Sequence, residues 1–543
     1  MDFGLWTLDF NLRLMSQMLK SSGSMAVATL TSRLLGMVRE IVYAWFMGDT
    51  WVAGVFKFAF QIPNLFRRLL GEGALTAAFI PIFKEKEKIH GEKEMWRASN
   101  AVISGLVVAA AVIVGLVMLG ISVALAAHQF EAKTELMLQL LRVMFPYMLL
   151  VCLAAAFMGM LNARGHFFIP AMGATALNVV MIASVLWLAP KLGTDLPEEL
   201  RLPRQIFALA YGVLAAGVAQ AAFQLPTLWR DGFRYRWVSP WRDETVRLVV
   251  TRMIPGTIGV AAFQINVTLV QFLAVSVNPQ INASFDYAVR LMELPQGMFG
   301  ISLATYLLTT LSGLAVEKNY AEFRATLRHG LGTLLFANLI AAVLLVVLAE
   351  PIVRLIFEHG DKFTAASTTR ATLALQCLAP GLVAFSSVNV LARAFFALGD
   401  TQTPMKISIF CLTLNLVLSA ALILPLQQGG LGIANTVTSI CSVWLLLFAL
   451  RKKMGKLEME SLHQTLVPLA LAGVLAGLLA WHGWQCWEHS LGHKTLALKI
   501  GAVFVPAGIA GLIYWLAALA LKIPAAKETT DFALARFGKT GRA

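Results

Sequence analysis

Three apolar segments of this sequence contain arginine, a side chain that is costly to bury. Their charged residues are Arg33, Arg39 and Glu40 in SRLLGMVREI, Arg67, Arg68 and Glu72 in PNLFRRLLGEG, and Asp286, Arg290 and Glu293 in DYAVRLMELP. An arginine at the centre of a membrane-spanning helix costs about 2.5–3.5 kcal/mol on insertion scales. These arginines are therefore expected to face a polar cavity, a carboxylate or a ligand rather than lipid.

Two interpretations of the arginines are open. In the first they form structural ion pairs, Arg39 with Glu72 and Arg290 with Glu293. In the second, their guanidinium forks bind the oxygens of a phosphate or pyrophosphate bidentately. The three glutamates, Glu40 included, could neutralise three arginines but not all of them. This imbalance favours an anionic ligand.

Helical geometry indicates which arginines share a face. Arg33 and Glu40 lie two helical turns apart on one face, whereas Arg39 lies about 120° round the helix from Arg33. Arg67 and Arg68 are adjacent and diverge by about 100°, so they cannot both point inward equally. We expect Arg67 to face the cavity and Arg68 to have a structural or interfacial role.

The overall composition is that of a membrane protein. Of the 543 residues, 58% are hydrophobic and 14% are charged, against roughly 25% charged residues in soluble proteins, and the mean hydropathy is +0.72. Apolar stretches close to the ~20 residues that cross a bilayer as a helix recur along the chain. A β-barrel would show short alternating segments instead. The sequence predicts an all-α polytopic membrane protein.

We predict about fourteen transmembrane helices from these stretches. They fall near residues 24–47, 52–83, 99–127, 135–161, 168–190, 204–229, 246–276, 283–315, 323–349, 366–397, 404–425, 430–450, 463–483 and 497–521. Lys and Arg cluster in the connections after the second, sixth and twelfth spans, whereas three connections on the opposite side contain neither. By the positive-inside rule, both termini are expected in the cytoplasm.

A faint internal repeat divides the spans into two groups of six. The spacing from Pro146 to Pro170 is the same as the spacing from Pro380 to Pro404, and the sequence around the two pairs is similar. The repeat predicts two parallel lobes with a cavity between them, a common plan of secondary transporters. The predicted divisions are an N-terminal extension 1–17, an N-lobe 18–230, a cytoplasmic linker 231–245, a C-lobe 246–456, two further helices 457–522 and a cytoplasmic tail 523–543.

Several function classes are disfavoured. The formal charge of +14 sits mostly in short connections between apolar segments, which indicates membrane topology rather than nucleic-acid binding. The five cysteines and nine histidines show no metal-ligand spacing, and neither GEG at 71–73 nor GKTG at 538–541 has the setting of a phosphate-binding loop. A membrane enzyme acting on lipid pyrophosphates would need a nucleophile, a metal or a His/Asp pair. We expect no enzyme activity, metal or cofactor.

Four motifs, SRLLGMVRE, AFQIPNLFRRLLGEGALTAAFIPIF, RLMELPQGMFG and GDTQTPMKI, resemble the MurJ (MviN) lipid II flippase family of the multidrug/oligosaccharidyl-lipid/polysaccharide exporter superfamily. The resemblance implies alternating-access transport of an undecaprenyl-pyrophosphate-linked peptidoglycan precursor, lipid II, across the bacterial inner membrane. It implies that 457–522 lines a groove for the polyprenyl tail. The expected partners are lipid II and membrane lipids, with the cell-wall synthesis machinery as a further candidate.

The resemblance also implies roles for individual residues. The substrate-binding positions fall on Arg33, Arg39, Arg67, Arg290 and Asn64. The positions with a role in ion pairing or gating fall on Glu40, Glu72, Glu293 and Arg68.

Some residues that are typical of the family are missing from this chain, so the driving force of transport stays open. Many members have an Asp where this chain has Gly54 and another where it has Val289. Some relatives use a sodium site with an Asp ligand, and here the corresponding helices offer only weak neutral candidates. These candidates are Asn266, Asn415, Ser419 and Asn435. Dependence on the membrane potential is at least as plausible as sodium coupling.

Alternatives within transport are a flippase for another polyprenyl-linked glycan and a multidrug antiporter on the same scaffold. An antiporter for cationic drugs would favour buried carboxylates over arginines, which counts against it.

Overall fold

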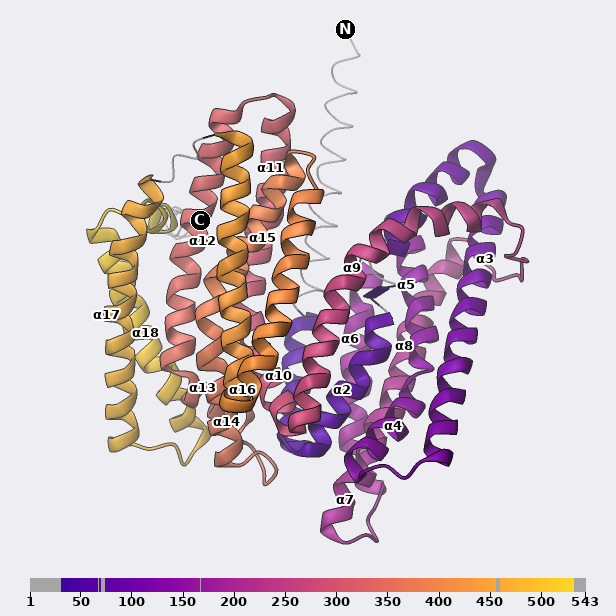
Figure 1. Cartoon of the computed structure of the whole chain (residues 1–543), viewed down its shortest axis with the longest axis horizontal. Helices are drawn as coiled ribbons and strands as arrows, with labels where there is room; N and C mark the ends of the chain where they lie inside the picture. The colour runs from indigo at the N-terminus through magenta and orange to yellow at the C-terminus, as the bar shows by residue number, and fades with distance from the viewer. Residues whose placement is uncertain (1–30, 67, 70–73, 167, 456–459, 532–543) are drawn as a thin grey trace, which may run out of the picture. The chain divides into compact units, whose positions relative to one another are not determined.

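The computed structural model describes residues 31–66, 68–69, 74–166, 168–455 and 460–531, and these ranges contain helices and no strand (Figure 1). The chain divides into two compact units, Met1–Phe272 and Leu273–Ala543, which have separate hydrophobic cores. The predicted all-α polytopic fold is confirmed.

The first unit begins, in the described residues, with a helix over 31–47. Its further elements are α2 (Trp51–Phe66), α3 (Ala74–Ala127), α4 (Ala132–Met144), α5 (Tyr147–Ala163), α6 (Phe168–Ala183), the π-helical turn η2 (Ser184–Leu188), the 3₁₀ turn η3 (Ala189–Lys191), α7 (Glu198–Gln205), α8 (Phe207–Arg230) and most of α9 (Glu244–Val277).

The second unit takes the end of α9 and all later helices. These are α10 (Pro279–Pro295), the π-helical turn η4 (Gln296–Ile301), α11 (Ser302–Val316), α12 (Tyr320–Val347), α13 (Ala349–Phe357), α14 (Ala365–Leu378), the 3₁₀ turn η5 (Ala379–Gly381), α15 (Leu382–Ala397), α16 (Gln402–Met454), α17 (Glu460–Ser490) and α18 (Leu496–Ala520). A short helix over 524–531 follows.

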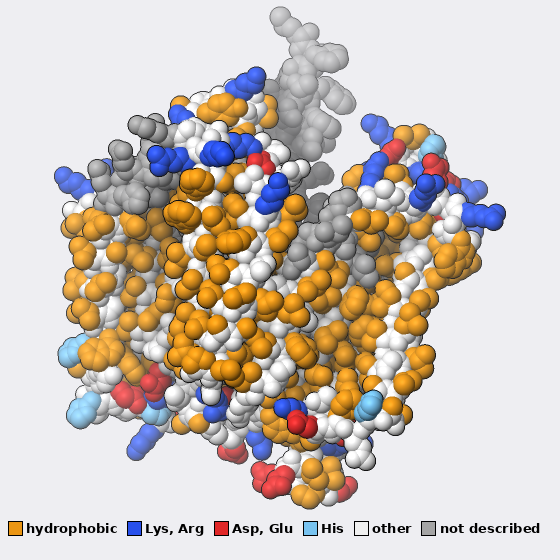
Figure 2. Space-filling view, viewed as in Figure 1, with side chains coloured by type: hydrophobic (Ala, Val, Ile, Leu, Met, Phe, Trp, Pro, Cys, Tyr) orange, Lys and Arg blue, Asp and Glu red, His pale blue; other side chains and the backbone are white. Residues whose placement is uncertain are grey.

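Eight helices of the described chain are long and apolar enough to cross a membrane, and α4 with α5, bent by 40°, can be a ninth. Figure 2 shows broad bands of hydrophobic side chains along the helices, with Lys, Arg, Asp and Glu gathered at the helix ends. The number fourteen stays a prediction. One long helix, α16, contains two of the predicted spans, which a non-helical residue, Gln427 (φ 49°), separates.

The predicted connection at 84–97 is helical, which is a difference from the sequence analysis. The first part of α3 continues through it as far as Gly91, where φ is 80°. Lys and Glu are good helix formers, and pairs such as Lys84–Glu87, 2.7 Å apart, support the helix. The helix breaks at Gly91 because a glycine takes a positive φ without a steric penalty.

The predicted repeat has a structural counterpart in each unit. In the first unit α5 ends at Ala163 and α6 begins at Phe168, and in the second α15 ends at Ala397 and α16 begins at Gln402. The two turns are therefore equally long. Each contains a glycine in the left-handed region, Gly165 (φ 86°) and Gly399 (φ 72°), at the same place in the turn. The same helix–turn–helix therefore occurs twice.

The two turns are fixed by ion pairs of opposite polarity. In the first unit, Asp231, just beyond α8, lies 4.0 Å from Arg164 of the turn and 3.1 Å from His166, which is charged only when protonated. In the second unit, Asp400 of the turn lies 2.7 Å from Lys453, near the end of α16. The turn thus supplies the basic partner in one unit and the acidic partner in the other.

Replacing Asp400 tests how much its ion pair contributes. Hydrogen bonds from Lys453 and from the Thr403 N–H hold the pKa of Asp400 well below its usual range. Because the folded pKa is lowered, the pair stabilises above the unfolded pKa of about 3.9 and this contribution is lost on acidification. Asp400→Asn should cost about 1 kcal/mol or less at pH 7. Asp400→Ala, which also removes the acceptor for Thr403, should cost about 1 kcal/mol more.

The measurement is the apparent Tm of the detergent-solubilised protein between pH 3 and pH 8. The gap between wild type and Asp400→Asn should begin to narrow as the pH falls below about 4. A gap that is unchanged at low pH would contradict an electrostatic origin.

Candidate functional site

Arg39 makes several polar contacts in the first unit. Its Nη2 is 2.6 Å from Glu40 Oε1, and its Nη1 donates to Asn178 Oδ1 on α6 at 3.0 Å. The guanidinium also lies 5.4 Å from the centre of the Tyr43 ring, a cation–π distance. The side chains of Arg39 and Glu40 are 16% and 5% exposed. Arg39 is therefore compensated within its own helix rather than left as a bare cation.

Asn178 joins the first helix to α6. Besides accepting from Arg39, it donates through Nδ2 to the backbone carbonyl of Ser32 at 3.1 Å. Its side chain is buried, so both halves of the amide are used without access to water. The helical pattern paired Arg33 with Glu40 on one face, yet Glu40 binds its neighbour Arg39 because two adjacent long side chains can reach each other despite their angle.

Arg33 is exposed and forms no hydrogen bond or ion pair within the described part of the chain. Asn64, directly after Pro63 of α2, is half-buried. Both residues stay candidate ligand contacts. Arg67 and Glu72 lie outside the described residues, and so does the possible Arg39–Glu72 pair.

Arg68 has a structural contact, as predicted. It stands in a π-helical turn and donates through Nη1 to Gln264 Oε1 on α9 at 3.2 Å. Gln264 is 4% exposed, so this hydrogen bond links the residues that follow α2 to α9 within the first unit.

Arg290, in the second unit, has two carboxylate partners on its own helix, α10. Its Nη1 lies 3.0 Å from Glu293 Oε2, and its Nη2 lies 3.7 Å from Asp286 Oδ1. The spacings i+3 and i−4 put all three side chains on one face. The Arg290–Glu293 pair of the first interpretation is therefore present. Asp286, one turn earlier, supplies a second carboxylate although position 289 is valine.

The weak sodium candidates have different surroundings. Asn266 is buried on α9, and Asn415 and Ser419 are buried one turn apart on α16. Asn435 uses its amide to donate to the Leu431 carbonyl of its own helix at 2.9 Å. No group of three or more His, Cys, Asp or Glu side chains in the described ranges could hold a metal.

Sequence analysis overlooked three polar residues of the first unit. Asn178 and Gln264 are the amide partners of Arg39 and Arg68, and nothing in a single sequence pairs residues so far apart. Lys57 is a half-buried cation on α2. The signal for Lys57 was available, because it is a lysine well inside the predicted span 52–83.

Comparison with protein-family models gives the decisive observation. The model described as "Lipid II flippase MurJ" matches residues 43–500, which is most of the chain. The chain belongs to the lipid II flippase MurJ family.

Curated members of the MurJ family align over nearly the full length. The protein of Vibrio cholerae serotype O1, named "Probable lipid II flippase MurJ", is 31% identical and covers 96% of this chain and 100% of its own. The protein of Bdellovibrio bacteriovorus with the same name is 32% identical, covering 92% and 94%. That of Burkholderia cenocepacia, named "Lipid II flippase MurJ", is 31% identical, covering 83% and 88%.

Solved structures agree on the fold. A lipid II flippase MurJ in an inward closed conformation superposes with a TM-score of 0.72 at 21% identity, covering 91% of this chain and 99% of that one. An inward-facing multidrug transporter of the MATE family superposes with a TM-score of 0.63 at 15% identity, covering 80% and 99%. At these low sequence identities, the structural similarity shows a shared fold alone.

The contacts of Asn178 lead to a stability prediction. Asn178→Ala removes a hydrogen bond to a charged group and one to a backbone carbonyl, so it should destabilise the first unit by about 1–3 kcal/mol. Thr175→Ala, one turn earlier on α6, is the matched control and should have a smaller effect. Thermal unfolding of both variants checks this, and equal losses would contradict a special role for Asn178.

Because Arg290 has two carboxylate partners, we expect the effects of removing them to be non-additive. Asp286→Asn or Glu293→Gln alone leaves Arg290 one acidic partner, so each variant should reach the membrane at the wild-type level. The double variant leaves a cation in an apolar helix without a carboxylate partner on α10, so it should reach the membrane at lower levels or fail to complement. Complementation and membrane yield of the three variants measure this. Additive effects would show that the carboxylates act independently.

Proposed function

We propose that this protein flips lipid II from the inner to the outer leaflet of the bacterial cytoplasmic membrane, by alternating access, for cell-wall synthesis. The observation that carries the proposal is the family match over residues 43–500, because it coincides with half-buried arginines in apolar helices. Flipping makes and breaks no covalent bond, so the chain needs binding groups rather than a catalytic centre.

Arg39 and Arg290 are the cations that bind the pyrophosphate of the lipid in this proposal. Each already holds a carboxylate at hydrogen-bond distance, Glu40 and Glu293 respectively. Without substrate, these carboxylates lower the cost of a cation in the membrane. A pyrophosphate offers the same planar pair of oxygens with more charge, so it competes for the guanidinium. Arg33, Arg67 and Asn64 are the proposed additional contacts.

The exchange of carboxylate for pyrophosphate gives Glu40 and Glu293 a gating role. When substrate takes the arginine, the ion pair between the arginine and the carboxylate breaks, which favours movement or protonation of that carboxylate. Substrate binding is thereby coupled to a rearrangement on its own helix. This coupling supplies the differential interaction that any conformational shift requires.

The polyprenyl tail of the substrate lies along α17 and α18 in this proposal. Support comes from the surface of these helices, where Leu471, Leu478, Phe504 and Leu512 are all about 60% exposed or more. Within the second unit, both helices pack into one buried cluster, which includes Ala476 of α17, Ala510 of α18 and Phe336 of α12. The proposed orientation has both termini and the basic connections in the cytoplasm. The proposed lobes are 18–230 and 246–456, and the cell-wall synthesis machinery is the proposed protein partner.

Depletion and complementation test the function. Cells depleted of the protein should lose lipid II at the outer leaflet, measured with a membrane-impermeant reagent that modifies it, and accumulate it inside. Unchanged outer-leaflet lipid II, with loss of another polyprenyl-linked glycan, would support the alternative flippase instead.

Single arginine variants test the site. Arg39→Ala and Arg290→Ala should each abolish complementation, because the binding of pyrophosphate loses a bidentate donor, while membrane yield stays measurable. Arg201→Ala is the control, since Arg201 is exposed on the short helix α7, and it should behave as wild type. Normal growth of both site variants would reduce these arginines to structural ion pairs.

A further inference from the structure

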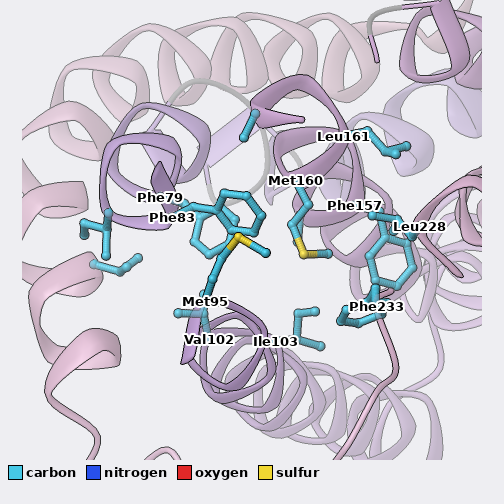
Figure 3. Packing of buried hydrophobic residues seen from close by; sticks show 14 residues of the cluster. Phe79, Phe83, Met95, Val102, Ile103, Phe157, Met160, Leu161, Leu228 and Phe233 are labelled. Carbon is cyan, nitrogen blue, oxygen red and sulfur yellow. The ribbon is translucent and has the colours of Figure 1, made fainter. Parts of the chain in front are cut away.

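The segment 231–243 between α8 and α9, here called the strap, is irregular but closely attached to the first unit. It leaves α8 through Gly232, whose φ of 95° favours glycine. The next residue, Phe233, is 1% exposed and inserts between Trp96 and Phe157, with ring centres 5.6 and 6.1 Å away. Figure 3 shows Phe233 in the buried cluster with Phe157 and Leu228.

Hydrogen bonds then hold the strap along α3. Asn100 Nδ2 donates to the Arg234 carbonyl at 3.0 Å. Ser104 Oγ lies 3.3 Å from the Tyr235 hydroxyl and accepts from the Val238 N–H at 3.4 Å. These contacts occupy successive turns of one helix, so the strap runs along α3.

Close packing and an ion pair complete the attachment. Gly105 has no side chain, and a Cβ built there would lie 3.3 Å from Pro240 of the strap. The strap then returns to Arg97, whose Nη1 is 2.9 Å from Asp243, and Asp243 caps the start of α9 by accepting from the Thr245 N–H at 2.9 Å. It therefore reaches its furthest point near Gly105 and comes back.

The depth of this furthest point follows from the helix. The stretch of α3 from Arg97 to Gly105 rises by about 12 Å, at roughly 1.5 Å per residue of an α-helix. Charged residues occupy α3 up to Arg97, and the segment after it is apolar and belongs to a candidate membrane span, Phe79–Ala127. The strap therefore covers the part of α3 that crosses from the water boundary into the apolar layer.

Aromatic and basic side chains cover the outer side of the strap. Tyr235, Trp237 and Trp241 are 49%, 57% and 76% exposed. Arg236 and Arg242 are exposed as well, and neither forms a hydrogen bond or ion pair within the described part of the chain.

The acidic residues of the strap are already engaged. Asp231 lies 3.1 Å from His166, and Asp243 binds Arg97. No acidic side chain of the strap is therefore available to neutralise Arg236 and Arg242, and the outer face of the strap is cationic.

We propose that the strap docks on the anionic phospholipid headgroups of the membrane leaflet at this end of α3. Trp237 and Trp241 flank the tip and lie at the apolar–polar boundary, where tryptophan side chains are favoured. Arg236 and Arg242 bind the headgroup phosphates beside them. A membrane surface is the matching partner because the strap lies on a membrane span and combines aromatic with basic groups at one depth.

Consequently, anionic lipid fixes the connection between α8 and α9 against the bilayer. The proposal concerns the lipid environment and not the transported substrate, so it stands or falls separately from the flippase activity.

A fluorophore on the strap tests the proposal in the full-length protein. Ser239 is exposed between the two tryptophans, and Cys486 is the exposed native cysteine, so Ser239→Cys is introduced into a Cys486→Ser background and labelled. The protein is placed in nanodiscs containing a headgroup nitroxide lipid, with phosphatidylcholine alone or mixed with phosphatidylglycerol. Quenching should rise several-fold with phosphatidylglycerol and fall again as salt screens the charges.

Matched variants identify the groups responsible. Arg236→Gln/Arg242→Gln should abolish the dependence on phosphatidylglycerol, and Trp237→Ala/Trp241→Ala should lower quenching in both lipids. Arg201→Gln/Arg204→Gln removes the same charge from exposed positions of α7 and should change nothing. Thermal unfolding equal to that of the labelled parent confirms that each variant is folded.

Three outcomes would overturn the proposal. Equal quenching in the two lipid mixtures would exclude an anionic lipid. An equal loss in the α7 control would reduce the effect to net charge. A fluorescence change with soluble polyglutamate but none with phosphatidylglycerol would indicate an acidic protein partner in place of the membrane.

Discussion

The cost of placing a guanidinium in an apolar segment constrains both units of this protein. A charge that leaves water must find compensation nearby, and Arg39 and Arg290 both find it close at hand. Arg39 binds the adjacent Glu40 and the amide of Asn178, whereas Arg290 binds carboxylates one turn before and one turn after it on the same helix. Local compensation lets each helix carry its cation into the membrane before any ligand is present. An anionic ligand can therefore displace the carboxylate only if it interacts with the guanidinium more strongly than the carboxylate does.

The same constraint explains how much of the site sequence could predict. Charged residues in apolar segments are conspicuous, so Arg39 and Arg290 were identifiable, and the i+3 spacing of Arg290 and Glu293 made their pair one of the two interpretations. Asn178 and Gln264 could not be predicted, because an amide is neutral, common in transmembrane helices and paired through tertiary structure. Periodicity alone also did not identify the partner of Glu40. It assigns side chains to faces, whereas a long side chain reaches across the angle between neighbouring positions.

The fold class was easier to predict from the sequence than the ends of the individual helices. Hydropathy predicted an all-helical membrane protein and located most apolar helices, since apolar length depends on composition alone. The connection at 84–97 was expected to interrupt the helix because it is highly charged, but charge opposes membrane burial and not helix formation. A positive φ at Gly91 breaks that helix. The break of α16 at Gln427 falls between the predicted spans 404–425 and 430–450, next to Pro425 and Gly429, so its place was predictable from the sequence.

The repeat shows which features two halves of a chain need to share. The turns at Gly165 and Gly399 have the same length, spacing and left-handed glycine, so their backbone geometry is the same. Their ion pairs are reversed, with His166 facing Asp231 in one unit and Asp400 facing Lys453 in the other. An ion pair is equally strong whichever segment supplies the positive and the negative group. A turn with a left-handed residue, in contrast, is strained when its glycine is replaced. The charges can therefore be exchanged in evolution while the positions of glycine and proline persist. For this reason the repeat is visible in the sequence mainly through glycine and proline, which determine the backbone conformation.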